Sequence, residues 1–123
     1  YLLHMTSLYF KEKHSFNKRY EEANRMLDKY KTKKPIIVEK KKNQPDIPDI
    51  DRKKFLVPDN LSMAEFMYVI RKRLQISPDK SIYLFVDTGG LIPTTYTIGQ
   101  VYHNSKSDDG FLYIKYCGES TFG

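Results

Sequence analysis

The side chains that could act as nucleophiles or metal ligands are few and widely spaced in this sequence. Cys117 is the only cysteine, and a catalytic cysteine needs a neighbouring base, usually histidine, to hold it as thiolate. No histidine lies near Cys117 in the chain. His14 and His103 show no ligand spacing to each other or to the cysteine, so a zinc site is not expected.

Two further features resemble parts of catalytic motifs without completing one. Gly89-Gly90 has no phosphate-loop glycines around it and no Lys-Ser/Thr after it. The Asp108-Asp109 pair precedes Gly110, which is typical of a hairpin turn rather than of paired catalytic carboxylates. No Ser/His/Asp set can be argued. The sequence therefore predicts a protein that is not an enzyme and that uses no metal or cofactor.

The remaining reactive group is the α-carboxylate of Gly123. Residues 117–123 form a polar, glycine-containing tail after the last predicted strand. One interpretation is a frayed terminus. The other is a flexible arm that presents its carboxylate to an enzyme, because glycine has no Cβ and can enter a narrow active site. A suitable fold before the tail would favour the second interpretation.

The composition indicates one soluble domain with a basic N-terminal half. No run approaches the ~18 apolar residues of a membrane-spanning helix, and a single cysteine fits the reducing cytosol. Residues 1–54 hold 15 Lys/Arg and 8 Asp/Glu, a net +7, whereas residues 55–123 hold 6 and 7, a net −1. The basic half could be a solvated face, or could bind an acidic partner, an anionic membrane or nucleic acid.

Two helices are predicted before the first strand. The longer one starts after Ser15 as N-cap and carries one apolar stripe at helical spacing: Phe16, Tyr20, Ala23, Leu27 and Tyr30. Glu22 and Met26 lie four residues apart on a different line of that helix, so they need not face the same core. A shorter helix is predicted over residues 8–13.

The next segment predicts two strands joined by a loop. Residues 36–38 are β-branched, residues 40–51 mix lysines, prolines and aspartates, and residues 55–57 form the second strand. Pro58 cannot donate to a ladder, which favours an edge position. Alternation places Lys54 and Leu56 on one face of this strand.

The second half predicts a helix, a strand, a short helix and a last strand. Ser62 and Glu65 form a capping box, after which apolar residues recur at helical spacing. Residues 82–86 are almost continuously apolar, as in a central strand buried on both faces. A short helix is expected over 98–102 and the last strand over 111–116.

This order predicts an α+β fold, the ubiquitin-like β-grasp, in which one helix packs across a four-stranded mixed sheet. The expected organisation is an N-terminal helical extension over 5–33, with two helices, a core over 34–116 and a flexible tail over 117–123. We expect residues 1–4 to derive from cloning and Met5 to be the natural start.

Four segments in order resemble one known family: 46–58 (DIPDIDRKKFLVP), 66–73 (FMYVIRKR), 108–113 (DDGFLY) and 118–123 (GESTFG). They are similar to the autophagy ubiquitin-like modifiers, the GABARAP family, and the similarity runs from Met5 to Gly123. The chain differs by one extra residue within 41–45 and by Gly89-Gly90 where the family often has a Pro-Pro pair.

The resemblance implies that Gly123 is conjugated to phosphatidylethanolamine. In the family a ubiquitin-activating-like enzyme adenylates the terminal glycine, and a conjugating enzyme passes it to the lipid amine. A cysteine protease reads the preceding residue, here Phe122, and later removes the lipid. The implied locations are the cytoplasm and, after lipidation, the membrane of an autophagosome or another organelle.

The resemblance also implies a site for short aromatic-x-x-aliphatic peptides of cargo receptors, which add a strand to the sheet edge. The implied aromatic pocket consists of Glu22, Met26, Pro35, Ile37, Lys54, Leu56 and Phe111. The implied aliphatic pocket consists of Phe55, Val57, Pro58, Leu61, Phe66, Val69 and Arg73. Periodicity alone would place Phe66, Val69 and Phe111 in the core. Lys53 and Lys54 would suit acidic residues that precede the motif.

A different class of function stays open at this point. The chain could be an unconjugated ubiquitin-like scaffold that binds the cytoskeleton or acidic partners through its basic N-terminal helices. Nucleic acid is not expected as a partner, because the sequence contains no base-reading motif.

Overall fold

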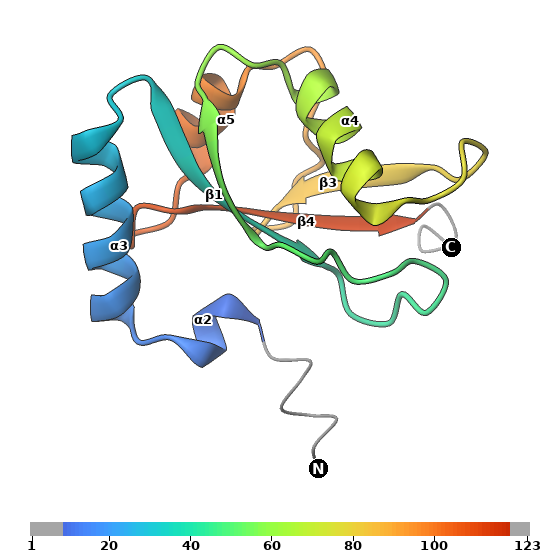
Figure 1. Cartoon of the computed structure of the whole chain (residues 1–123), viewed down its shortest axis with the longest axis horizontal. Helices are drawn as coiled ribbons and strands as arrows, with labels where there is room; N and C mark the ends of the chain where they lie inside the picture. The colour runs from blue at the N-terminus through green and yellow to red at the C-terminus, as the bar shows by residue number, and fades with distance from the viewer. Residues whose placement is uncertain (1–8, 119–123) are drawn as a thin grey trace.

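The computed structural model describes residues 9–118. Residues 1–4, expected to derive from cloning, lie outside this part of the chain, as do Phe122 and Gly123. The elements follow in the order α2 (Phe10–Lys13), α3 (Phe16–Lys29), β1 (Lys33–Lys40), β2 (Lys54–Pro58), α4 (Met63–Leu74), β3 (Ile82–Val86), α5 (Ile98–Ser105) and β4 (Leu112–Gly118) (Figure 1).

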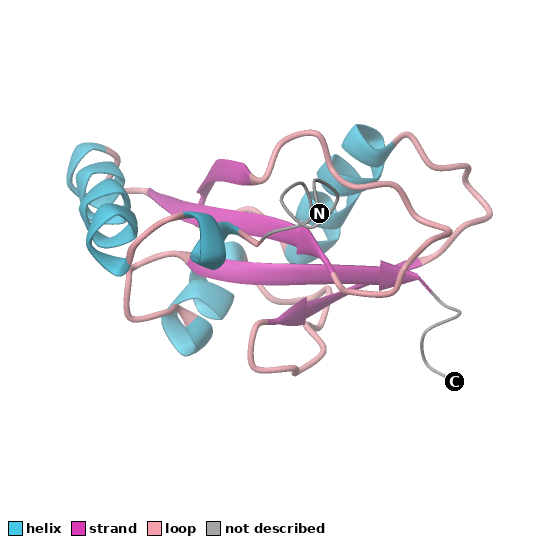
Figure 2. Ribbon diagram, turned by 90° about the horizontal axis from the view of Figure 1, so that it is seen from below, coloured by secondary structure: helices cyan, strands magenta, loops and turns pink. Residues whose placement is uncertain are grey.

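The four strands form one mixed sheet in the order β2-β1-β4-β3. β1 pairs antiparallel with β2 and parallel with β4, and β4 pairs antiparallel with β3. Figure 2 shows β1 and β4 running in the same direction, from the end of the sheet beside α3 toward the end at which β4 finishes. The predicted α+β fold, with its mixed sheet and two N-terminal helices, is confirmed.

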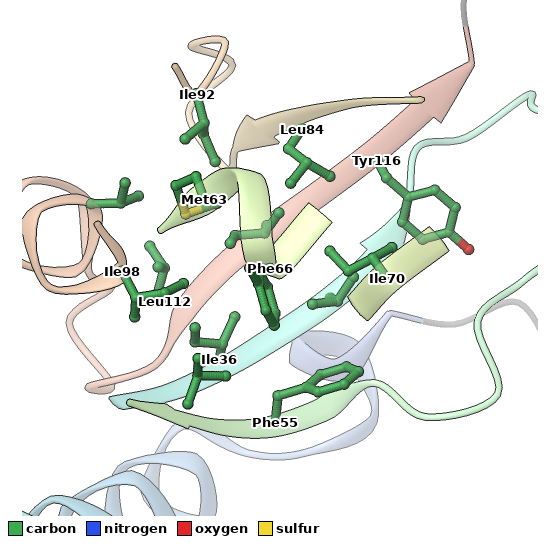
Figure 3. Close-up of a cluster of buried hydrophobic side chains, with 14 of the residues drawn as sticks. Ile36, Phe55, Met63, Phe66, Ile70, Leu84, Ile92, Ile98, Leu112 and Tyr116 are labelled. Carbon is green, nitrogen blue, oxygen red and sulfur yellow. The ribbon is translucent and has the colours of Figure 1, made fainter. Parts of the chain in front are cut away.

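α4 covers one face of the sheet because its apolar positions recur once per turn. Ser62 caps the helix: its Oγ accepts from the backbone N–H of Glu65 at 3.1 Å, and the Glu65 carboxylate accepts from the Ser62 N–H at 2.9 Å. Phe66 and Ile70 are then buried against the strands, as Figure 3 shows. Gln75 ends the helix in the left-handed conformation with φ of 54°.

Alternation along β1 divides the core into two clusters. Ile36 and Val38 face α4 and belong to the main cluster, whereas Ile37 points to the other face. The cluster on that other face consists of Phe10, Ala23, Ile37, Phe111 and Tyr113, with Met26 packed against it. The N-terminal helices therefore cover the second face of the sheet.

The predicted apolar stripe of α3 is only partly a buried stripe. Ala23 is fully buried, but Phe16 and Tyr20 remain 45% and 48% exposed, and Tyr30 is exposed as well. The rings of Phe16 and Tyr20 stack on each other with centroids 5.9 Å apart. Ala23 and Met26 face the sheet, whereas Phe16, Tyr20 and Tyr30 of the stripe stay outside that contact.

The prediction that residues 82–86 form a central strand is wrong, since β3 is an edge strand. Its outer side is covered by the segment that follows, where the N–H of Ile92 donates to the Leu84 carbonyl at 2.9 Å and Leu91 bridges to Phe85. On one face Lys41 Nζ lies 3.7 Å from the centroid of the Phe85 ring. Because these contacts cover β3, its sequence is almost continuously apolar although it is an edge strand.

Of the four strands only β3 has the predicted bounds, and α5 is longer than predicted. β1 begins at Lys33 rather than at residue 36, α5 extends to Ser105, and β4 extends to Gly118. Cys117 and Gly118 therefore belong to the sheet and not to the tail, and Cys117 is buried. None of the helices within residues 9–118 has the length and apolar character that crossing a membrane requires.

Candidate functional site at the β2 edge

The outer side of β2 is the feature of the described fold best suited to bind another chain. β2 is hydrogen-bonded to β1 on one side and is the last strand of the sheet on the other. Its final residue, Pro58, is exposed. An extended peptide can add to such an edge through main-chain hydrogen bonds, and alternate side chains then meet opposite faces of the sheet.

The register of β1 and β2 sorts the predicted pocket residues onto these two faces. Leu56 pairs with Pro35 and Lys54 pairs with Ile37, so these four lie on the face that α3 covers. Phe55 pairs with Ile36 and faces α4. The structure thus separates the residues of the two implied pockets onto opposite sides of one strand.

The residues of the implied aromatic pocket come together between α3 and the sheet. Lys54 Nζ forms an ion pair with the Glu22 carboxylate of α3. Met26, one helical turn further, packs against the cluster that contains Ile37 and Phe111. Ile37 and Phe111 are both fully buried, whereas Lys54 and Glu22 keep 42% and 26% of their side chains exposed. The apolar floor is therefore closed, and its charged rim is accessible.

Phe10 of α2 belongs to the same cluster, and sequence reasoning missed it. Its ring meets the Phe111 ring edge to face with centroids 5.4 Å apart, and Lys54 Nζ lies 5.8 Å from its centroid. The backbone N–H of Phe10 donates to Glu39 Oε2 at 2.6 Å, a buried bond. Only the helical spacing of residues 8–13 hinted at this segment, because Glu39, Phe111 and Tyr113, which fix it, lie 29 or more residues away in sequence.

Glu39 holds this face together electrostatically. Its side chain is 2% exposed and pairs with Lys53 at 3.0 Å and with Lys115 at 3.8 Å. Burial lowers the pKa of the Lys115 ammonium below its ordinary value, although Glu39 opposes that shift. Lys53, expected to meet acidic residues of a peptide, is thus already paired within the fold, and Lys54 is the more exposed of the two cations.

The implied aliphatic pocket lies between β2 and α4. Phe55, Val57 and Phe66 are buried, and the rings of Phe55 and Phe66 meet at 90° with centroids 5.6 Å apart. Leu61 packs partly buried against this cluster. Val69 is 38% exposed, so the expectation from periodicity that it lies in the core is wrong.

Arg73 stands at the end of this second set. Its guanidinium donates two hydrogen bonds of 3.1 Å to the carboxylate of Asp51, from Nε to Oδ1 and from an η nitrogen to Oδ2. This bidentate pair joins the last turn of α4 to the segment that leads into β2. Arg73 therefore orients the loop that leads into β2.

The end of β4 lies at the opposite end of the sheet from α3 (Figure 1). The N–H of Gly118 donates to Gln44 Oε1 at 3.0 Å, and Gly118 pairs with Ile82 in the sheet. The two predicted conjugation residues, Phe122 and Gly123, lie beyond the described part of the chain. Within residues 9–118, no group of three or more histidine, cysteine or acidic side chains is arranged to hold a metal ion.

Comparison with known proteins gives a consistent result. A family model described as "Autophagy protein Atg8 ubiquitin like" matches residues 18–123. The chain is 48% identical over 114 residues to "Autophagy-related protein 8B" of Oryza sativa subsp. indica, covering 93% of this chain and 94% of that protein. It is 50% identical over 114 residues to "Autophagy-related protein 8" of Coccidioides immitis, covering 93% and 96%. A crystal structure of Trypanosoma brucei ATG8 superposes with a TM-score of 0.86 at 36% identity, covering 94% and 98%.

Proposed function

The chain belongs to the Atg8 family of ubiquitin-like autophagy proteins, and we propose that it is a lipid-conjugated adaptor. In this proposal Gly123 is joined to phosphatidylethanolamine, and the β2 edge binds aromatic-x-x-aliphatic peptides of cargo receptors. The protein then resides in the cytoplasm and, once lipidated, on an autophagosome or another organelle membrane. Family membership supports the general role, and the geometry of the β2 edge supports the adaptor function.

The observation that carries the proposal is the placement of two apolar sets on opposite faces of one edge strand. A peptide strand paired with β2 would direct one anchor toward Lys54 and Leu56, and a second anchor toward the Phe55 side. Burying an aromatic anchor of ~150–250 Å² contributes roughly 4–6 kcal/mol to binding before the cost of ordering the peptide is subtracted. Ordering the peptide offsets much of this, so a micromolar dissociation constant is expected.

The conjugation chemistry uses the carboxylate of Gly123 and leaves the fold unchanged. The carboxylate attacks the α-phosphate of ATP, which gives an acyl adenylate and pyrophosphate. A cysteine thiolate of the activating enzyme displaces AMP to form a thioester, and the conjugating enzyme's thiolate takes over the acyl group. The lipid amine then attacks the thioester carbonyl, forms an amide and releases the thiol, which takes up the proton that the amine loses.

Two acyl chains make the product a stable membrane anchor. Each buried methylene contributes about 0.8 kcal/mol, so one chain gives marginal attachment and the two chains of the lipid give a lasting one. A cysteine protease would reverse the attachment by hydrolysing the amide after Phe122-Gly123.

Reconstitution tests the conjugation half of the proposal. The chain is incubated with the activating and conjugating enzymes of its own organism, ATP and vesicles that contain phosphatidylethanolamine. We expect a faster-migrating lipidated band that requires ATP and is lost in Gly123→Ala. If the wild-type chain never acquires lipid, the conjugation proposal fails and an unconjugated scaffold becomes the better account.

A further inference from the structure

The segment 41–51, which we call the root loop, is fastened to the last residues of β4. The Tyr116 hydroxyl accepts from the Ile50 N–H at 2.9 Å and donates to the Pro48 carbonyl at 2.8 Å. At the other end of the loop, the Lys41 N–H donates to the Tyr116 carbonyl at 2.9 Å. The Tyr116 ring is fully buried at the end of the core opposite Ile98 (Figure 3). Both ends of the root loop are therefore anchored on one residue.

Two residues of the root loop reach further and hold Gly118. The side-chain oxygen of Gln44 accepts the Gly118 N–H at 3.0 Å, and Gln44 is only 7% exposed. Ile47, 5% exposed, lies over the same residue: a Cβ added at position 118 would be 2.5 Å from Ile47 Cδ1. A side chain at this position would therefore force the end of the Ile47 side chain to shift.

The loop itself is stiffened where it makes these contacts. Lys40 Nζ donates to the Ile47 carbonyl at 2.8 Å and pairs with Asp49 at 3.5 Å. Gln44 also donates from its amide nitrogen to the Asn43 carbonyl at 3.2 Å, which fixes the orientation of the amide. Gly118 therefore meets an ordered surface and not a loose loop.

Gly118 is the last described residue, and five residues lead from it to Gly123. Fully extended, five residues span at most about 16–18 Å. An enzyme that acts on the Gly123 carboxylate must therefore place its active site within that distance of Gly118. The position and direction of the chain at Gly118 consequently decide which approach of the enzyme is productive.

We infer that Gln44 and Ile47 are positioning residues for the conjugation reaction. They hold Gly118, and with it the point from which the chain continues toward Gly123. The inference rests on the proposed conjugation of Gly123 and adds to it a part of the fold that the activating enzyme relies on. Both residues act through Gly118, whose N–H Gln44 accepts and over which Ile47 lies.

The expected effect is on binding of the tail rather than on the chemical step. Ordering the backbone of one residue changes an equilibrium constant by roughly fivefold to thirtyfold. If Gly118 is released, the activating enzyme must order it, so the KM for this chain rises. The kcat stays the same, because the Gly123 carboxylate and ATP are unchanged once the tail is bound.

ATP–pyrophosphate exchange by the activating enzyme, with the full chain as substrate, measures both constants. We expect Gln44→Ala and Gly118→Ala each to raise the KM about five- to tenfold with kcat unchanged. Ile47→Val removes the Cδ1 atom that an added Cβ would meet, so Gly118→Ala/Ile47→Val should recover most of the wild-type KM. Asp46→Ala, an exposed change in the same loop, should leave both constants unchanged.

Amide hydrogen exchange checks the physical basis in the same variants. In Gln44→Ala the Gly118 amide should exchange at least tenfold faster than in wild type, while the Ile114 amide in the middle of β4 should not change. Wild-type kinetics in Gln44→Ala and Gly118→Ala would overturn the positioning role while leaving the conjugation proposal intact. Absence of exchange activity with the wild-type chain would overturn the conjugation proposal, and the positioning role with it.

Discussion

The ring of Phe10 meets the ring of Phe111 edge to face, at an interplanar angle of 73° and a centroid distance of 5.4 Å. Phe111 is part of the implied aromatic pocket, and Phe10 comes from a short helix 101 positions earlier in the chain. The N-terminal extension is therefore a structural part of the candidate peptide site. Phe10 is buried, with 6% of its surface exposed.

Replacing Phe10 by alanine should enlarge the aromatic pocket and weaken the fold. A buried Phe→Ala change costs about 3–5 kcal/mol, and the value should fall near 3 because the four-residue α2 can relax. The cavity left by Phe10 borders Lys54 and Phe111, and a larger tryptophan anchor can fill part of it. The extra buried surface should contribute roughly 1 kcal/mol, so the tryptophan-anchored peptide should gain about fivefold in affinity over the tyrosine-anchored one. Titration calorimetry with both peptides measures this ratio.

Phe16→Ala is the matched control, because the Phe16 ring is 45% exposed and lies outside the cluster. Phe16→Ala should change the ratio of the two peptide affinities and the free energy of unfolding much less than Phe10→Ala does. An unchanged tryptophan-to-tyrosine ratio in Phe10→Ala would show that Phe10 does not border the pocket.

Removing Arg19 should expose how much the fold depends on one buried ion pair. Asp109 is fully buried, and its carboxylate accepts from Arg19 at 2.6 Å, from the Tyr113 hydroxyl and from the Phe111 N–H. Arg19→Ala leaves that carboxylate without its cation, which should cost about 3 kcal/mol in the free energy of unfolding. Arg25→Ala, on an exposed position of the same helix, should cost much less. Equal denaturation midpoints for the two variants would refute the structural role of the pair.

Alkaline pH should destabilise the protein through its buried tyrosines. Burial, and then the hydrogen bond to Asp109, raise the pKa of the Tyr113 hydroxyl above its ordinary value of 10.0. A pKa raised in the folded state adds stability that is present below about pH 10, the pKa of an unfolded tyrosine, and that is lost as pH rises through the folded pKa. Burial also raises the pKa of Tyr116, and the lowered pKa of Lys115 acts in the opposite direction.

The difference between wild type and Tyr113→Phe isolates this contribution. The variant should be less stable at pH 8, because the hydrogen bond to Asp109 is missing, and its free energy of unfolding should fall less steeply between pH 10 and pH 11.5. Denaturant unfolding across that range measures both slopes. If the free energy of unfolding falls equally steeply with pH in wild type and in Tyr113→Phe, the raised pKa of Tyr113 does not contribute to stability in this range.

The parts of the fold that sequence reasoning predicted correctly depend on local rules. The Ser62 and Glu65 capping box needs only residues three apart, and the alternation of Lys54 to Val57 needs only one strand. The edge position of β2 followed from Pro58, whose missing N–H acts at that residue alone.

The parts that sequence reasoning missed depend on partners far apart in the chain. Asp109 was read as a turn residue, yet it is buried because Arg19 reaches it across 90 positions. Glu39 was not singled out in the sequence, and its burial depends on Lys53, Lys115 and the Phe10 N–H. No local pattern carries this information, because each partner is supplied by a different element.

The residues of the two implied pockets were assigned by resemblance rather than by pattern. Val69 illustrates the difference: helical periodicity placed it in the core, and the structure leaves it 38% exposed. A position can share the spacing of a buried face and still lie at its margin, where a ligand can reach it. Whether these pockets bind peptides stays a prediction.

The most direct test of the adaptor function is titration calorimetry of an aromatic-x-x-aliphatic peptide, with acidic residues before the motif, against wild type and Lys54→Ala/Leu56→Ala. The wild type should bind with a micromolar dissociation constant. The double variant should bind at least a hundredfold more weakly while keeping its circular dichroism spectrum. Lys80→Ala/Leu91→Ala, two exposed residues beyond the β2 edge, should bind as wild type does. An unchanged affinity in Lys54→Ala/Leu56→Ala would contradict the assignment of the peptide site to the β2 edge.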